Sequence, residues 1–396
     1  MESPDVYIPM DRRQAMINNE TLPSRTSGAA LIADISGFTS LTAAMVEALG
    51  PKHGAGESTR QLNLIYEALI PEVHRHRGSV IGFGGDAITC WFDDDDGLRA
   101  TGCALEMQQV MFRFEEIQTL SGTTTSMAIK VGIGAGAAHR FLVGDPQIQF
   151  LDVLAGSTLD RMAIAEKEAA RGEVVLGPLV ANTLSEKVKV TDWRQVAETG
   201  DRLAVISALA EGVSPEKISW PALATQDGTS PLIEAQIRPW LLPPVYDRLA
   251  AGRGAFLAEL RTTVTLFLRF EGIDYDRDIA ARDKLDAYIR WVQNTLAQYE
   301  GYLIKLTIGD KGSYLLATFG APLAHGNDAV RAVAAALELQ TLSSTLEFIT
   351  STQIGPHPIH GVCEDSNLIT SIDVHRLLQV AATDSLSRYD QGANRT

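Results

Sequence analysis

The sequence predicts an α+β fold built from two ferredoxin-like units, each with the element order β-α-β-β-α-β. In the first half of the chain, apolar residues follow strand and helix periods in that order. The same order returns more faintly in the second half, which indicates an internal repeat. The length of 396 residues also favours two domains over a single core.

The first unit opens with an apolar strand over residues 29–33, and a turn of small and polar residues after it begins at Asp34. A loop is expected around residues 50–56, where glycines gather. The remaining elements of the unit are, in order, a helix over 58–74, a hairpin over 78–92 with Asp86 near its turn, a helix over 97–113 and a strand over 128–136.

The second half repeats this order with weaker patterns. Its elements are a strand over 264–270, a helix over 281–296, a hairpin over 301–319 and a helix over 327–342. A proline-rich stretch with little periodicity separates the halves and predicts a linker. We therefore expect a first domain over 28–210, a linker over 211–255, a second, incomplete domain over 256–355 and an atypical tail over 356–396.

Composition argues against several classes of function. The net charge is −15 with neutral histidines, which opposes nonspecific binding to nucleic acid or to anionic membranes. The cysteines, Cys90, Cys103 and Cys363, show no zinc-binding spacing and are predicted to be reduced thiols. The N-terminus lacks the order of a signal peptide, and no apolar run reaches the length of a membrane span. These features predict a cytoplasmic protein without nucleic-acid or membrane partners.

Two motifs in the first half resemble the class III adenylyl and guanylyl cyclase family. In that family one aspartate ends the first strand and another lies in the next hairpin, and the segments Asp34–Thr39 and Gly85–Asp86 match these positions in order. Later segments, Lys130–Gly134 and 156–165, are similar to the soluble, bicarbonate-responsive adenylyl cyclase branch. The resemblance implies a pseudo-two-fold pair of cyclase domains within one chain. It covers residues 28–190 and 262–355.

The resemblance also implies two-metal chemistry. Asp34 and Asp86 would hold two Mg²⁺ or Mn²⁺ ions, with the carbonyl of Ile35 as a further ligand, because these hard cations take oxygen ligands and share them with substrate phosphates. The ions would help the ribose 3′-hydroxyl of ATP attack the α-phosphate, releasing cyclic AMP and pyrophosphate. Asp34 and Asp86 are therefore the expected catalytic residues of an adenylate cyclase in intracellular signalling.

Further residues would bind the nucleotide by the same resemblance. Backbone N–H groups at the start of the helix after Asp34 can cradle phosphates. They belong to Ser36, Gly37, Phe38 and Thr39. Lys130 looks like the lysine that reaches the triphosphate, and Lys305 resembles the partner-domain lysine that donates to adenine N1, which favours ATP. Each residue also has a plain structural interpretation, as a turn residue or a solvated lysine.

The second domain is expected to lack a competent metal site. Asp310 matches the hairpin aspartate of the first domain, but Arg269 stands where the other metal aspartate would be, and a cation there repels metal. The second domain would therefore contribute substrate contacts to one site at the domain interface. Elsewhere, the acidic run over residues 93–96 is interpreted as a solvated turn, and His74 and His76 as surface residues.

The sequence also departs from the family pattern. Gly82 and Ala163 stand where the family and its soluble branch carry a lysine and an arginine, which argues against activation by bicarbonate. After Gly355 no asparagine is followed four places on by an arginine, the pair that would stabilise the transition state. This departure favours an alternative function, a catalytically weak, nucleotide-binding regulatory pseudo-cyclase. A third interpretation, a ferredoxin-like cyclic-dinucleotide synthase, lacks its glycine-glycine-acidic-acidic hairpin here.

Overall fold

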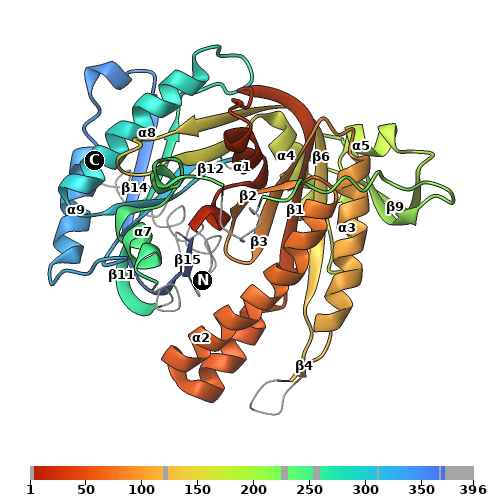
Figure 1. Cartoon of the computed structure of the whole chain (residues 1–396), viewed down its shortest axis with the longest axis horizontal. Coiled ribbons are helices and arrows are strands. Elements are labelled where there is room, and N and C mark those ends of the chain that lie inside the picture. The colour runs from red at the N-terminus through yellow and green to blue at the C-terminus, as the bar shows by residue number, and fades with distance from the viewer. Residues whose placement is uncertain are drawn as a thin grey trace, which may run out of the picture.

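The computed structural model describes most of the chain. The described residues are 4–118, 124–223, 231–252, 259–309, 312–364 and 367–370. Within these ranges the chain forms two large β-sheets flanked by helices, one sheet in each half (Figure 1). None of the helices in these ranges combines the length and the apolar character needed to cross a membrane.

The first half has the predicted β-α-β-β-α-β order. Its elements are β1 (Arg25–Ser36), α2 (Phe38–Arg75), β2 (Ser79–Phe83), β3 (Ala87–Asp93), α3 (Leu98–Met111), the short helix η2 (Phe112–Phe114) and β6 (Ala128–Val143). The strands lie in the order β2-β3-β1-β6, and β1 is antiparallel to both of its neighbours. The end of β1 therefore lies beside the β2–β3 turn and the start of β6.

The first sheet extends beyond the predicted unit. The additional elements are β4 (Ile117–Gln118), β5 (Thr124–Thr125), β7 (Leu151–Ala155), α4 (Ser157–Lys167), β8 (Val174–Leu176), α5 (Pro178–Thr183), β9 (Val188–Gln195) and β10 (Arg202–Leu209). β8 runs parallel to β6 and is followed by β10 and β9, while β7 pairs with the outer part of β6. β4 and β5 form a separate two-stranded ribbon.

Helices cover both faces of this sheet. One face of β1, with Ala29 and Leu31, packs against α2 and α3, while Ala30 on the other face packs against Leu159 and Met162 of α4. Successive residues of a strand point to opposite faces, so a strand covered on both sides is apolar throughout. This explains why the first strand appears in the sequence as one continuous apolar run.

The second half repeats the order of the first. Its elements are β11 (Glu259–Glu271), α8 (Ala281–Gln298), β12 (Tyr302–Gly309), β13 (Gly312–Phe319), α9 (Asp328–Leu339), the short helix η5 (Ser344–Leu346), β14 (Ser351–Glu364) and β15 (Asn367–Thr370). The strand order β12-β13-β11-β14 matches that of β2-β3-β1-β6. β14 continues past Gly355 into the predicted tail, and residues 371–396 of that tail lie outside the described part.

Helix α2 is interrupted at Gly50. Gly50 has φ 78° and ψ 165°, values outside the helical region. Beyond it the chain folds back, because a Cβ on Gly54 would lie 2.5 Å from the carbonyl oxygen of Met45. The loop predicted over residues 50–56 is therefore wrong except at this one glycine, since the helix resumes directly after it.

Each half has its own hydrophobic core, and one arm of the first half reaches the second core. Apolar residues at helical spacing in α2 are fully buried in the first core: Leu62, Ile65, Leu69 and Val73. The second core lies between α8, α9 and their sheet. It also contains Phe141 and Val143 from β6 and Val153 from β7. The β6–β7 arm therefore joins the two halves through apolar contact.

A smaller apolar cluster connects the N-terminus and the predicted linker to the second sheet. The helices of these segments are η1 (Pro4–Tyr7), α1 (Met10–Ile17), α6 (Glu234–Ile237), η3 (Arg238–Trp240) and α7 (Pro243–Ala250). Ile8, Trp240 and Leu242 are buried together with Ile304 and Leu316 of the second sheet. The sequence predicts none of these helices, because each is too short to show a helical period.

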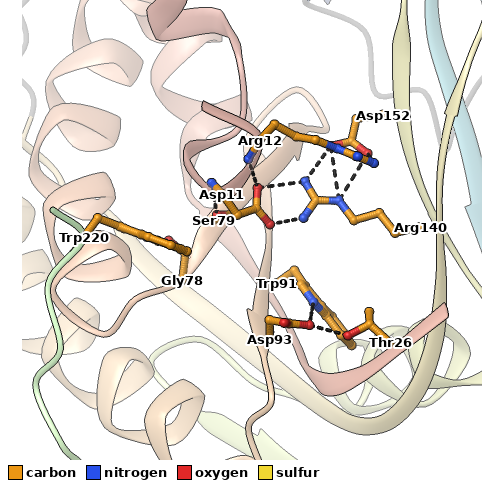
Figure 2. A network of polar contacts seen from close by, with 10 residues as sticks. All are labelled: Asp11, Arg12, Thr26, Gly78, Ser79, Trp91, Asp93, Arg140, Asp152 and Trp220. Atoms are coloured by element: carbon orange, nitrogen blue, oxygen red, sulfur yellow. Dashed lines mark hydrogen bonds and ion pairs between the residues drawn. The ribbon is translucent and has the colours of Figure 1, made fainter. Parts of the chain in front are cut away.

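A buried ion network fixes α1 to the first half (Figure 2). Arg140, 3% exposed, lies between Asp11 and Asp152, and it donates to Asp11 at 3.0 Å and to Asp152 at 2.5 Å. Arg12 also donates to Asp152, at 3.0 Å and 3.2 Å, and the Asp11 N–H donates to Ser79 at 3.0 Å. Burial acts to raise the pKa of Asp152, but the two arginines outweigh it and hold that pKa below its ordinary value.

Two residues interpreted as solvent-exposed are buried. His76 is fully buried at the end of α2, with its ring 3.0 Å from the carbonyl oxygen of Glu72. Asp95, in the acidic run before α3, is 9% exposed and accepts hydrogen bonds from the N–H groups of Arg99 and Ala100. Because the first N–H groups of a helix have no partner within it, a carboxylate placed there is structural rather than solvated.

Candidate metal and nucleotide site

Asp34 and Asp86 lie at the same end of the first sheet. The antiparallel pairing of β1 and β3 places Asp34 opposite Ala87, the residue after Asp86. The Ile35 N–H donates to the carbonyl oxygen of Asp86 at 3.0 Å. Both aspartates are half-buried. The fold therefore brings together two carboxylates that are far apart in the sequence, with the backbone of Ile35 beside them.

Both aspartates act on Tyr66 of α2. Its hydroxyl donates to the carbonyl of Gly85 in the hairpin turn at 2.8 Å, and its ring centre lies 4.8 Å from that of Phe83. Burial, and then the charges of Asp86 and Asp34, raise the pKa of Tyr66 well above its ordinary value. The hydrogen bond of Tyr66 therefore stabilises the turn that contains Asp86. The sequence showed Tyr66 as part of an apolar helix face and gave no signal for its hydroxyl contact.

Lys130 stands between two carboxylates. It lies opposite Asp34 in the β1–β6 pair, with its ammonium 3.5 Å from Asp34 Oδ2. The same ammonium forms a closer ion pair with Glu166 of α4. Burial acts to lower the pKa of Lys130, but Glu166 and Asp34 outweigh it and raise that pKa. The structure thus places Lys130 at the aspartates, together with Glu166, which belongs to no motif that sequence reasoning identified.

The turn from β1 into α2 contains the four predicted phosphate-binding residues. Gly37 has φ 100°, a backbone conformation that favours glycine, and a Cβ there would lie 2.7 Å from the carbonyl oxygen of Ser126. Phe38 is buried at the start of α2, while Ser36 is half-buried and Thr39 is exposed. No side chain caps this helix start. Its first N–H groups are thus suited to donate hydrogen bonds to an anion.

Lys305 reaches this end of the first sheet from the second half of the chain. It lies in β12, and its ammonium donates to the carbonyl of Phe83 in β2 at 2.6 Å. A Cβ on Gly84 would lie 3.3 Å from the same nitrogen. Burial lowers the pKa of Lys305 to about 8. A cation from the second half is therefore held next to the hairpin that contains Asp86.

Further polar contacts join the halves away from this site. Asp286 and Gln293 of α8 accept hydrogen bonds from the N–H groups of Gly144 and Asp145, each at 2.8 Å. Gln293 also donates to the carbonyl of Gln149 at 2.8 Å. Together with the apolar contacts of the β6–β7 arm, these bonds fix α8 to the first half. The two halves therefore pack closely against each other.

The corresponding end of the second sheet has a different charge arrangement. β1 ends at Ser36, which pairs with the first residue of β6, and β11 ends at Glu271, which pairs with the first residue of β14. A glycine with positive φ follows each of these strands. Arg269, two residues before the end of β11, is therefore the counterpart of Asp34, as predicted. Arg269 forms an ion pair with Glu271 at 2.9 Å. A cavity of about 280 Å³ lies here, and its lining includes Gly156, Asp160, Glu271 and Gly312. Asp310 lies outside the described residues.

The donor set at Asp34 and Asp86 suits a hard cation that brings its own ligands. Among the described residues, no group of three or more histidine, cysteine, aspartate and glutamate side chains could hold a metal ion by itself. Mg²⁺ keeps several waters and is held by one or two carboxylates plus substrate phosphates, so a pair of aspartates and a backbone carbonyl is compatible with it. Gly82 and Ala163, the positions where the family and its soluble branch carry cations, lie in β2 and α4.

Comparison with known proteins gives relatives by sequence, although no family model matches. Adenylate cyclase type 10 from Rattus norvegicus is 23% identical over 83% of this chain, and that from Homo sapiens is 24% identical over 83% of this chain. The chain spans only 22% and 21% of the length of these two relatives.

Solved cyclase structures align with about half of the chain. The guanylyl cyclase Cya2 is 22% identical, with a TM-score of 0.41, and covers 49% of this chain and 98% of its own. The adenylyl cyclase CyaB from P. aeruginosa is 17% identical, with a TM-score of 0.41, and covers 48% of this chain and 98% of its own. The sequence relatives, which extend over most of the chain, confirm its resemblance to the class III nucleotidyl cyclases and to their soluble branch.

Proposed function

We propose that this chain is an adenylate cyclase that converts ATP to cyclic AMP and pyrophosphate at the end of the first sheet. One observation carries the proposal. Asp34 and Asp86 meet at the end of β1, and Lys305 from the other half reaches the same hairpin. A site between paired cyclase domains requires two carboxylates on one domain and a cation that contacts the base on the other. We also propose a cytoplasmic location, where free thiols such as buried Cys90 and Cys103 stay reduced.

Asp34 and Asp86 would hold two Mg²⁺ or Mn²⁺ ions, with the Ile35 carbonyl as an additional ligand. When bound, such ions would make the ribose 3′-hydroxyl of ATP more acidic and neutralise charge on the phosphates. The protein's part is to fix both carboxylates in place. Tyr66 does this for the hairpin through its hydrogen bond to Gly85, and the β1–β3 pairing does it for Asp34.

The chain's other residues would orient the nucleotide. The N–H groups from Ser36 to Thr39, at the turn from β1 into α2, would donate hydrogen bonds to the phosphates, and Lys130 would approach the triphosphate from β6. The ammonium of Lys305 would donate to N1 of adenine, an acceptor that guanine replaces with a donor. With a pKa near 8, Lys305 is mostly charged at neutral pH and can act as this donor.

A second candidate function is a nucleotide-binding regulatory pseudo-cyclase. The departure after Gly355 favours it, because no asparagine there is followed four places on by an arginine, the pair that would stabilise the transition state. Loss of a cation that stabilises the transition state costs roughly 10² to 10³ in rate. Nucleotide binding would survive such a loss, since metal and phosphate contacts remain.

The two functions are separated by one assay on the full chain. Purified protein is incubated with Mn²⁺ and either ATP or GTP, and cyclic nucleotide and pyrophosphate are quantified. An Asp34→Asn, Asp86→Asn double variant serves as the control. Cyclic AMP that disappears in the double variant supports the adenylate cyclase. Metal-dependent ATP binding without product favours the pseudo-cyclase, and binding that the double variant retains contradicts both.

A further inference from the structure

We propose that Glu166 is a positioning residue of this site, which holds the ammonium of Lys130 away from close pairing with Asp34 and so keeps the Asp34 carboxylate available to a divalent cation. The inference rests on the proposed function only in assuming that Asp34 is a metal ligand. Nothing in the sequence motifs points to Glu166. Its role follows from the contacts that it makes in the folded chain.

Lys130 has two carboxylates within reach but contacts them unequally. The antiparallel β1–β6 pair places Lys130 directly opposite Asp34, so both side chains lie on the same face of the sheet. The Lys130 ammonium is 3.5 Å from Asp34 Oδ2, which is longer than a good hydrogen bond. Its ion pair with Glu166 is shorter. Glu166, rather than Asp34, is therefore the closer partner of this lysine.

The position of Glu166 is fixed by the packing of α4 on β6. A Cβ at Gly132 would lie 2.3 Å from the backbone nitrogen of Glu166, and one at Gly134 would lie 2.7 Å from the carbonyl oxygen of Thr158. The helix backbone thus rests directly on the strand, in space that any larger residue would occupy. The Glu166 side chain is only 19% exposed. A carboxylate anchored in this way can hold a flexible lysine in one place.

The charges explain why this matters for a metal. An ammonium close to Asp34 competes with a divalent cation for the same carboxylate, because like charges repel at this separation. Asp34 and Glu166 are the described carboxylates that lie within ion-pair distance of Lys130. Without the charge of Glu166, Asp34 alone would neutralise the ammonium. Lys130 would then move onto Asp34 and weaken the metal site.

The test is the equilibrium binding of Mn²⁺ by the full chain without nucleotide, followed by electron paramagnetic resonance. Glu166→Gln is expected to weaken binding roughly tenfold, the size of one close charge pair in a half-buried setting. Glu166→Asp should restore part of the affinity. Glu168→Gln, which removes an equal charge from the residue that follows α4, is the matched control and should bind like the wild type.

A double-variant cycle shows whether Glu166 acts through the lysine. In a Lys130→Met background, Glu166→Gln should have no further effect, because the competing ammonium is gone. Unchanged Mn²⁺ affinity in Glu166→Gln, an equal loss with and without Lys130, or no Mn²⁺ binding by the wild type would each overturn the proposal. If the cycle behaves as expected but the wild type forms no cyclic nucleotide, the positioning role stands and the proposed adenylate cyclase activity fails.

Discussion

The two halves of the chain share one topology but differ in the charges at the end of their first strand. In the first half, Asp34 and Asp86 lie side by side and the nearby Lys130 is paired mainly with Glu166. In the second half, Arg269 stands at the position of Asp34 and is paired with Glu271 on its own strand. The same fold thus carries two carboxylates at this place in one half and an arginine–glutamate ion pair in the other.

This difference indicates which features the fold requires and which it leaves free. Both halves bury apolar faces of their helices against the same strand order, since that burial stabilises each unit. The residues at the strand ends are half-exposed and contribute little to either core. They can therefore differ between repeats without altering the topology, and function is determined at those positions.

The largest expected effect separates the two strand ends directly. Asp34→Asn should lower cyclic AMP formation by about a thousandfold or more, because it removes a metal ligand that acts in the transition state. Glu271→Gln, which removes a carboxylate charge at the end of the first strand of the second half, should alter the rate by less than about twofold, since its ion pair is exposed. Equal losses in the two variants would contradict the assignment of one competent site. Initial rates with Mn²⁺ and ATP give both values.

The next effect tests whether the halves unfold together. Arg140→Met leaves Asp11 and Asp152 buried without their shared cation, which should cost about 3–5 kcal/mol in the free energy of unfolding. Because the β6–β7 arm packs into the second core, we expect one shifted transition in urea by circular dichroism. Arg60→Met, at an exposed pair, should change stability by less than about 0.5 kcal/mol.

The same network predicts that the stability of the fold depends on pH in the acidic range. Asp152 has a lowered pKa in the folded chain, so its contribution to stability is present above the unfolded pKa of about 3.9 and is lost as pH falls through the lower folded value. Urea midpoints measured between pH 6 and pH 3 should therefore fall less steeply in Asp152→Asn than in the wild type. Parallel curves would show that this carboxylate is not held in its charged form.

A smaller effect concerns the packing that positions Glu166. Gly132→Ala places a methyl group where the α4 backbone lies, and such overpacking costs about 1–3 kcal/mol. In Gly82→Ala the added methyl group would meet no atom within 4 Å, so this change should alter the unfolding free energy by about 0.5 kcal/mol at most. Thermal unfolding of the two variants makes the comparison. If both behave like the wild type, α4 is not anchored as described.

The smallest effect concerns the contribution of the second half to the site. Lys305 has a pKa of about 8 when folded and about 10.4 when unfolded, so between these values the unfolded chain binds more protons and stability rises with pH. The rise in the free energy of unfolding should be about 1 kcal/mol per pH unit, and Lys305→Met should abolish it. Urea midpoints at pH 8 and pH 10 measure it. Lys187→Met, at a more exposed lysine, should retain the wild-type slope.

The sequence predicted the order of elements in both halves because their helices and central strands carry long apolar patterns. It did not predict η1, α1 or the helices of the presumed linker, which depend on tertiary contacts: the burial of Ile8 and Trp240 against the second sheet and, for α1, the ion network at Arg140. The turn at Gly50 was overestimated as a loop, because glycine marks a break without showing its length.

The candidate site was predicted only in part. Asp34, Asp86, Lys130 and Lys305 were identified from motifs, and the structure places them near the same hairpin. Glu166 and the hydroxyl of Tyr66 were not identified, since their contacts depend on how α4 and α2 pack, which no local pattern encodes. Arg269 was matched correctly to Asp34, because each lies two residues before the end of its strand and three before a glycine with positive φ.

The ion network of Figure 2 also constrains the order in which the chain can fold during synthesis. Asp11 and Arg140 are 129 positions apart, so α1 leaves the ribosome long before the arginine that secures it has been made. Domains generally fold as units from the N-terminus, but this helix must wait for the β6–β7 arm. Although α1 precedes the first sheet in the sequence, it can therefore reach its final place only after the β6–β7 arm has been made.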